Sequence, residues 1–100
     1  MNLYQYLVVD AALNGTGVRT DFTSSDVELD KLNISETLKT KIVHWLDRYQ
    51  QQQFQGFEDA ETAESLDVEG MSIAQELRAA MKGVKVSYYS EAQGRRLVPS

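Results

Sequence analysis

Cysteine is absent from the 100 residues of the chain, and histidine occurs once, as His44. Without cysteine there is no disulfide scaffold and no thiolate ligand for a metal, and one histidine leaves the usual zinc ligand sets unfilled. The chain also lacks a long apolar run, because the hydrophobic residues near its N-terminus stop at Asp10 and no basic residue precedes them. We therefore expect no cofactor, no signal peptide, no membrane span and a cytoplasmic location.

Positive charge is scarce and unevenly placed. Lys and Arg number 10 against 15 Asp and Glu, which gives a formal net charge of -5. No Lys or Arg lies between Arg48 and Arg78, whereas Gly56–Gly70 is crowded with carboxylates. Phosphate binding needs clustered Lys and Arg, so this balance argues against a nucleic-acid partner and favours attraction to basic surfaces.

The composition otherwise fits a folded protein. One hundred residues are enough for one domain and too few for two, and an apolar content of 42% supports a packed core. We expect residues 1–100 to form a single domain.

Two strands are predicted before residue 25. Leu3–Val9 is rich in aromatic and β-branched residues and has apolar side chains on both faces, which is typical of a central strand. Asn14 and Gly15 mark a turn, after which Val18–Phe22 is expected to pair back on the first strand.

A helix is predicted from Ser35, a residue suited to N-capping, to a stop before Gly56. His44 falls on its solvent side, between Lys41 and Arg48. On the opposite side, apolar residues at helical spacing form one stripe: Leu38, Ile42, Trp45, Leu46 and Tyr49.

A second helix is predicted from Asp67, taken as its N-cap, to a stop at Lys82 and Gly83. Its apolar face carries Leu66, Gly70, Ile73, Leu77, Ala80 and Met81. An inward glycine costs helix propensity, so we expect Gly70 to allow the close approach of a neighbouring element.

A strand follows the second helix, because Val84, Val86 and Tyr88 alternate with polar residues. Residues 95–98 add a short edge strand. The predicted order is β-β-α-α-β-β, an α+β fold with two helices packed on a small, mainly antiparallel sheet.

Two patterns suggest chemistry, and both are incomplete. Asp26, Glu28 and Asp30 are spaced as in the start of a calcium loop, but Lys31 stands where that loop needs its glycine. We interpret them as an acidic loop, with no metal. His44 has Asp47 as its only nearby carboxylate and no nucleophile, so we expect no enzymatic activity.

The stretch after the first helix is a candidate protein-binding surface. Phe54 and Phe57 stand directly before its charges, and apolar anchors beside an acidic rim are typical of such surfaces. The predicted charged contacts are Glu58, Asp59, Glu61 and Glu64. Asp26, Glu28 and Asp30 form a second acidic candidate. A solvated loop and helix start is the alternative interpretation.

Three motifs carry a family resemblance. They are Ile34-Ser35-Glu36-x-Leu38 leading to Trp45-Leu46-Asp47-x-Tyr49, then Asp67-x-Glu69-Gly70-x-x-Ile73-Ala74-x-x-Leu77, then Val84-x-Val86-x-Tyr88-Tyr89. Over residues 34 to 89 the chain resembles small acidic bacterial immunity proteins of polymorphic toxin and contact-dependent growth inhibition systems. The matching positions specify a fold and carry no functional site across.

The resemblance implies a cognate toxin as the partner. Many toxin domains of such systems are nucleases with basic substrate clefts, and an acidic protein of this size can occlude such a cleft stoichiometrically, without chemistry. The competing interpretation is a regulatory or adaptor module, or a homodimer, that uses the tyrosine-bearing sheet. Self-association, or a partner indifferent to the acidic stretch, would favour it.

Overall fold

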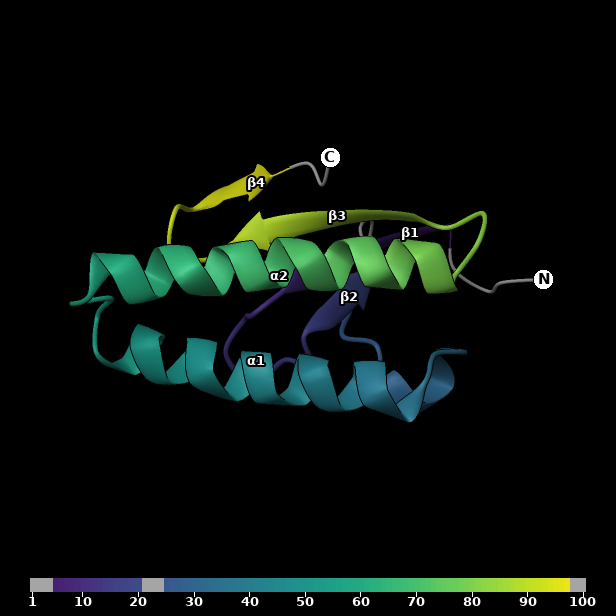
Figure 1. The fold of residues 1–100 in the computed structure, drawn as a ribbon, viewed down its shortest axis with the longest axis horizontal. Helices are drawn as coiled ribbons and strands as arrows, with labels where there is room; N and C mark the ends of the chain where they lie inside the picture. The colour runs from purple at the N-terminus through teal and green to yellow at the C-terminus, as the bar shows by residue number, and fades with distance from the viewer. Residues whose placement is uncertain (1–4, 21–24, 98–100) are drawn as a thin grey trace.

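In a computed structural model the chain folds into two helices and a four-stranded sheet; the structure describes residues 5–20 and 25–97 (Figure 1). The elements are β1 (Tyr6–Asp10), β2 (Val18–Thr20), a 3-10 turn η1 (Leu29–Lys31), α1 (Glu36–Phe54), α2 (Ala60–Ala80), β3 (Lys85–Ser90) and β4 (Arg95–Leu97). The predicted α+β order is confirmed. Leu3, Tyr4, Phe22 and Val98, which the sequence assigns to strands, lie outside the described residues.

The sheet is mixed, with strand order β2-β1-β3-β4, so β1 is the central strand that its sequence predicts. β1 pairs antiparallel with β2, and β3 pairs antiparallel with β4. The middle pair, β1 with β3, is parallel, in register from Tyr6 opposite Lys85 to Asp10 opposite Tyr89. The connection between these two strands contains both helices, as a parallel pair requires a long crossover.

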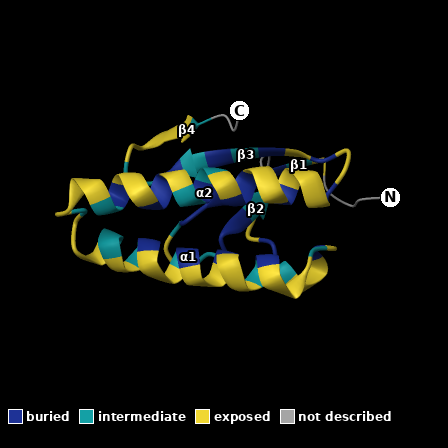
Figure 2. Ribbon diagram, viewed as in Figure 1, coloured by how far each residue is buried: buried dark blue, intermediate teal, exposed yellow. Residues whose placement is uncertain are grey.

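Both helices contribute to one hydrophobic core with the sheet. Figure 2 shows the buried residues of α1 on the side that faces α2 and the strands. Trp45 has no exposed surface; its indole Nε1 donates to the Leu66 carbonyl at 2.9 Å, and its ring centroid lies 6.0 Å from that of Tyr88. The predicted stripe of α1 therefore is a core face that reaches both α2 and β3.

The ends of α1 follow the local signals in the sequence. Ser35 is the N-cap, and its Oγ accepts from the Leu38 amide at 3.1 Å. At the other end the Phe57 amide donates to the Gln52 carbonyl, while Gly56 has a φ of 72°, a left-handed conformation that glycine adopts without strain. The chain then reverses into α2.

α2 begins two turns earlier than predicted. Its N-cap is Asp59, whose side chain accepts from the amides of Glu61 and Thr62. Asp67 is wrong as an N-cap, because it lies buried inside the helix. The acidic residues obscured a narrow apolar stripe, Ala63 and Leu66, which continues the helical face toward the N-terminus. Neither helix of the described residues is long and apolar enough to cross a membrane.

Gly70 lies under the ring of Tyr88, as the prediction of a close approach requires. A Cβ added at Gly70 would stand 2.3 Å from Tyr88 Cε1 and 2.7 Å from its hydroxyl oxygen. The side chain of Tyr88 therefore occupies the space that any other residue at position 70 would need.

Candidate functional site

The four carboxylates predicted as partner contacts gather where α1 gives way to α2. Glu58 precedes the N-cap Asp59, and Glu61 and Glu64 lie in the first turns of α2. All four are exposed, and none takes part in an ion pair among the described residues. Most of the stretch interpreted as loop is thus helix, which fixes the backbone positions of Glu61 and Glu64.

The start of α2 also stabilises negative charge. Asp59 Oδ2 accepts from the Thr62 hydroxyl at 2.7 Å. This hydrogen bond, and those from the Thr62 and Glu61 amides, hold the pKa of the Asp59 carboxyl below its ordinary value. Because the amides of the first turn carry the positive end of the helix dipole, Asp59 and Glu61 stand where carboxylates are favoured.

The two phenylalanines differ in how they lie. Phe54 ends α1 with 80% of its surface exposed, which is the largest exposure among the large apolar residues described. Phe57 is half-buried; its ring meets Tyr49 edge-on at a centroid distance of 5.8 Å. Phe54 therefore offers a free apolar surface, whereas Phe57 mainly anchors the connection between the helices.

A groove of about 550 Å³ runs between α1 and α2 beside this end of the molecule. Asp59 and Glu61 line it together with Arg48 of α1. The sequence placed every cation far from the acidic stretch, but the helix pairing brings Arg48 to the groove. Arg48 there forms an ion pair with Glu69, so it does not neutralise the four exposed carboxylates.

The second acidic candidate lies at the other end of α1. Glu28 pairs with Lys31 at 3.8 Å, and Asp30 pairs with Lys39 at 3.3 Å. By the rise of a 19-residue helix, about 28 Å separates the two ends of α1, so the two acidic groups do not converge. Asp26 is exposed and bridges to Arg19 through the backbone.

The sequence raised two other possibilities for chemistry, a catalytic His44 and a metal site. His44 is exposed, on the solvent side of α1 as expected, in a groove with Lys41 and Arg48. Within residues 5–20 and 25–97 no three His, Asp or Glu side chains gather as a metal site needs.

Asp67 is the centre of a buried polar network that the sequence did not reveal. Its side chain is 4% exposed; Oδ1 accepts from the hydroxyls of Tyr49 at 2.8 Å and Tyr88 at 2.6 Å, and Oδ2 accepts from Ser90 Oγ at 2.7 Å. The Tyr49 hydroxyl in turn accepts from the Ala92 amide at 2.9 Å. One carboxylate therefore joins α1, α2 and β3.

The hydrogen bonds of this network show which groups carry the protons. Because the Tyr49 hydroxyl accepts from Ala92, its hydrogen is free to point at Asp67. Burial raises the pKa of both Tyr49 and Tyr88, so both remain donors. A signal did exist in the sequence: Asp67 precedes Gly70 by three residues and Ala74 by seven, which is the spacing of the buried face.

The tyrosines of the sheet divide between its two faces. Tyr88 is buried under the helices, whereas Tyr6 and Tyr89 point to the other face. There Lys85 lies over the Tyr6 ring at 5.5 Å and Arg19 over the Tyr89 ring at 5.8 Å. Two cations, Lys85 and Arg19, thus cover these rings, and the acidic surface lies at the helix turn.

The described residues thus form a small α+β fold with exposed carboxylates at the turn between its two helices. The chain belongs to the Serratia CdiI immunity protein-like family, whose sequence profile matches residues 9–91. The match extends the resemblance seen in the sequence to β2 and to the end of β1. A comparison with curated proteins gave no match. Membership implies a non-enzymatic protein that binds and inhibits the cognate toxin of a contact-dependent growth inhibition system.

Proposed function

We propose that the chain inhibits its cognate toxin by occluding a basic cleft with the surface formed by Phe54, Glu58, Asp59, Glu61 and Glu64, and that it does so in the cytoplasm. The inhibition is stoichiometric and involves no chemistry. The exposed edge of Phe57 borders this contact surface. A toxin with a basic cleft of this kind would be a nuclease, whose phosphate-binding groups the carboxylates neutralise.

The state of the carboxylates carries the proposal. Four exposed carboxylates, which form no ion pair with other described residues, lie at the start of α2, shortly after a phenylalanine at the end of α1 that is 80% exposed. In the second candidate, by contrast, Glu28 and Asp30 already pair with lysines. Unpaired charges lose less free energy when they meet a cationic partner, because no existing ion pair has to be broken first.

The apolar and charged residues have different tasks at such an interface. An exposed phenylalanine that becomes buried contributes mainly to a slow dissociation, whereas charges at a rim mainly raise the association rate. Phe54 at the end of α1 and the carboxylates at the start of α2 are held by two capped helices, so little order has to be gained on binding.

The test measures binding kinetics with the purified toxin domain of the same host. In the quadruple variant Glu58→Gln, Asp59→Asn, Glu61→Gln and Glu64→Gln, the association rate at low salt should fall at least about tenfold. Phe54→Ala should raise the dissociation rate about thirtyfold, the effect of about 2 kcal/mol at a binding hot spot.

The matched control neutralises the other acidic group, with Asp26→Asn, Glu28→Gln and Asp30→Asn. Its kinetics should stay close to those of the unmodified protein. If the triple variant loses binding and the quadruple variant keeps it, the contact surface lies at the N-terminal end of α1 and the proposal is wrong.

A further inference from the structure

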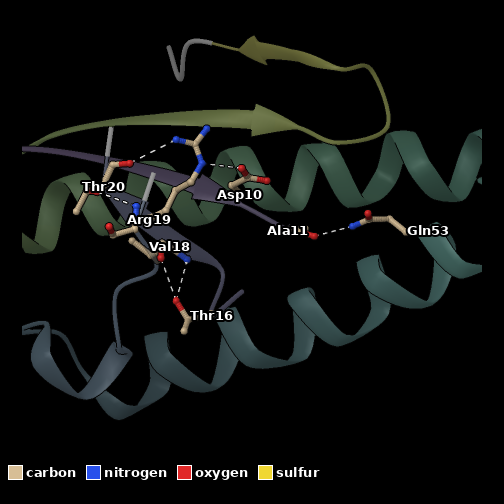
Figure 3. Close-up of polar contacts among 8 residues, drawn as sticks. Asp10, Ala11, Thr16, Val18, Arg19, Thr20 and Gln53 are labelled. Carbon is tan, nitrogen blue, oxygen red and sulfur yellow. Dashed lines mark hydrogen bonds and ion pairs between the residues drawn. The ribbon is translucent and has the colours of Figure 1, made fainter. Parts of the chain in front are cut away.

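The outer face of the sheet, opposite the helices, holds a buried carboxylate that is only half satisfied. Asp10 ends β1 with 7% of its surface exposed, and its Oδ2 accepts from Arg19 Nε at 2.7 Å (Figure 3). Asp10 Oδ1 is buried and has no hydrogen-bond donor among residues 5–20 and 25–97. An unsatisfied acceptor at such a place is costly, so a donor is to be sought among its neighbours.

The strand register brings a second carboxyl to the same place. Asp10 stands directly opposite Tyr89 in the parallel pair, and Glu91 follows Tyr89 by two residues, on the same side of the chain. Glu91 is half-buried and interacts with the Asp10 carboxyl. Two carboxylates in contact repel each other strongly unless one of them holds a proton.

We propose that Asp10 and Glu91 form a proton-binding pair, in which the Glu91 carboxyl donates to Asp10 Oδ1 near neutral pH. The proton satisfies the otherwise unpartnered oxygen. It also reduces the two negative charges beside the Arg19 guanidinium to one shared charge. Loss of the proton restores the second negative charge, and the two carboxylates then repel each other.

Within the part of the chain that the structure describes, the groups around the pair do not supply another donor to Asp10 Oδ1. Arg19 of β2 already donates to Asp10 Oδ2, and its guanidinium lies over the ring of Tyr89 of β3. From β4, Arg96 lies opposite Tyr89. The side-chain amide of Gln53 of α1 donates instead to the Ala11 carbonyl (Figure 3), and that of Gln50 donates to the Ala12 carbonyl.

The raised pKa of Glu91 agrees with this geometry. Burial, and then the Asp10 carboxyl, raise the pKa of Glu91 from 4.5 to about 7, against the lowering effect of Arg19. The native state then holds a proton that the unfolded chain has lost, so the stability contributed by the pair falls as pH rises from 4.5 to about 7 and is constant above that.

The pair controls the turn that closes the sheet. Glu91 starts the turn in which the Ala92 amide donates to Tyr49 and the Gly94 amide donates to the Ser90 carbonyl at 2.7 Å. Repulsion between Asp10 and an ionised Glu91 acts directly on this turn. Its amides should therefore exchange faster with solvent once the proton is lost.

The experiment follows the Glu91 side-chain carboxyl of the intact protein by carbon NMR between pH 4 and pH 9. A midpoint near 7, with protection of the Ala92 and Gly94 amides that falls above it after correction for the intrinsic pH dependence of exchange, supports the proposal. A midpoint near the ordinary value of 4.5 overturns it.

A variant gives an independent reading. Glu91→Gln keeps a donor for Asp10 Oδ1 but has no proton to lose, so the difference in melting temperature between pH 5 and pH 8 should shrink relative to the unmodified protein. Glu58→Gln, an exposed carboxyl with no such neighbour, should leave that difference unchanged. If Glu91→Gln behaves as Glu58→Gln does, the shared proton is not there.

Discussion

At the scale of single residues, Tyr88 is held from two sides. Its ring rests on the bare backbone of Gly70, and its hydroxyl donates to Asp67 three residues earlier on α2. The two contacts depend on each other, because a side chain at position 70 would push the ring away and draw the hydroxyl off the carboxylate. A buried carboxylate that loses a donor is destabilised.

Gly70→Ala should therefore lower the free energy of unfolding by about 2 kcal/mol, since overpacking outweighs the gain of about 1 kcal/mol in helix propensity. Urea denaturation followed by tryptophan fluorescence of Trp45 measures it. Ser72→Ala, an exposed position on the same helix, is the control and should change stability by less than about 0.5 kcal/mol. Equal or greater stability of Gly70→Ala would show that Tyr88 has room to move.

At the scale of the elements, local signals located the ends of α1 and the end of α2. Ser35, Gly56 and Gly83 act through their own backbone or side chain, so their effect can be inferred from neighbouring residues alone. The start of α2 was missed because Asp67 resembles an N-cap when its partners are unknown. Those partners, Tyr49 and Ser90, lie on other elements, and their contacts with Asp67 cannot be inferred from their spacing along the chain.

The same limit applied to the candidate site. The acidic residues and Phe54 could be identified from the sequence as candidates. Their exposure, and the ion pair that Arg48 already forms, could not be inferred from it. Likewise, the meeting of Asp10 and Glu91 depends on a parallel register between strands that are far apart in the chain. Pairing of this kind is set by packing of the whole core.

The N-cap of α2 gives a prediction at this scale, because Asp59 both caps the helix and belongs to the proposed contact surface. Asp59→Ala should lower the free energy of unfolding by about 1 kcal/mol, whereas Asp59→Asn should keep it nearly unchanged, since asparagine caps equally well. Thermal unfolding by circular dichroism measures both. Equal losses in the two variants would mean that the charge, and not the cap, stabilises the helix start.

At the scale of the whole molecule, the negative charge is concentrated. Residues 58–82 contain seven acidic and two basic residues, a formal charge of -5, which equals the net charge of the chain. The rest of the chain is balanced. A basic partner is therefore attracted chiefly by the α1–α2 turn and by α2, and it arrives with a preferred orientation.

Association with the toxin should therefore depend on salt. Raising the ionic strength from about 0.01 M to 0.15 M shortens the screening length from about 30 Å to about 8 Å, so the association rate should fall at least tenfold while the dissociation rate changes little. Stopped-flow mixing at several salt concentrations measures both rates. An association rate that does not vary with salt would exclude steering by this charge.

The parallel pairing of β1 with β3 has a consequence in time. Each residue of β1 pairs with a residue 79 positions later in the chain, so it has no partner until that residue has been synthesised. A ribosome that adds about 5–20 residues per second needs about 4–16 s to supply it. The centre of the sheet thus closes only after both helices have been made, and a nascent chain has no complete sheet until then.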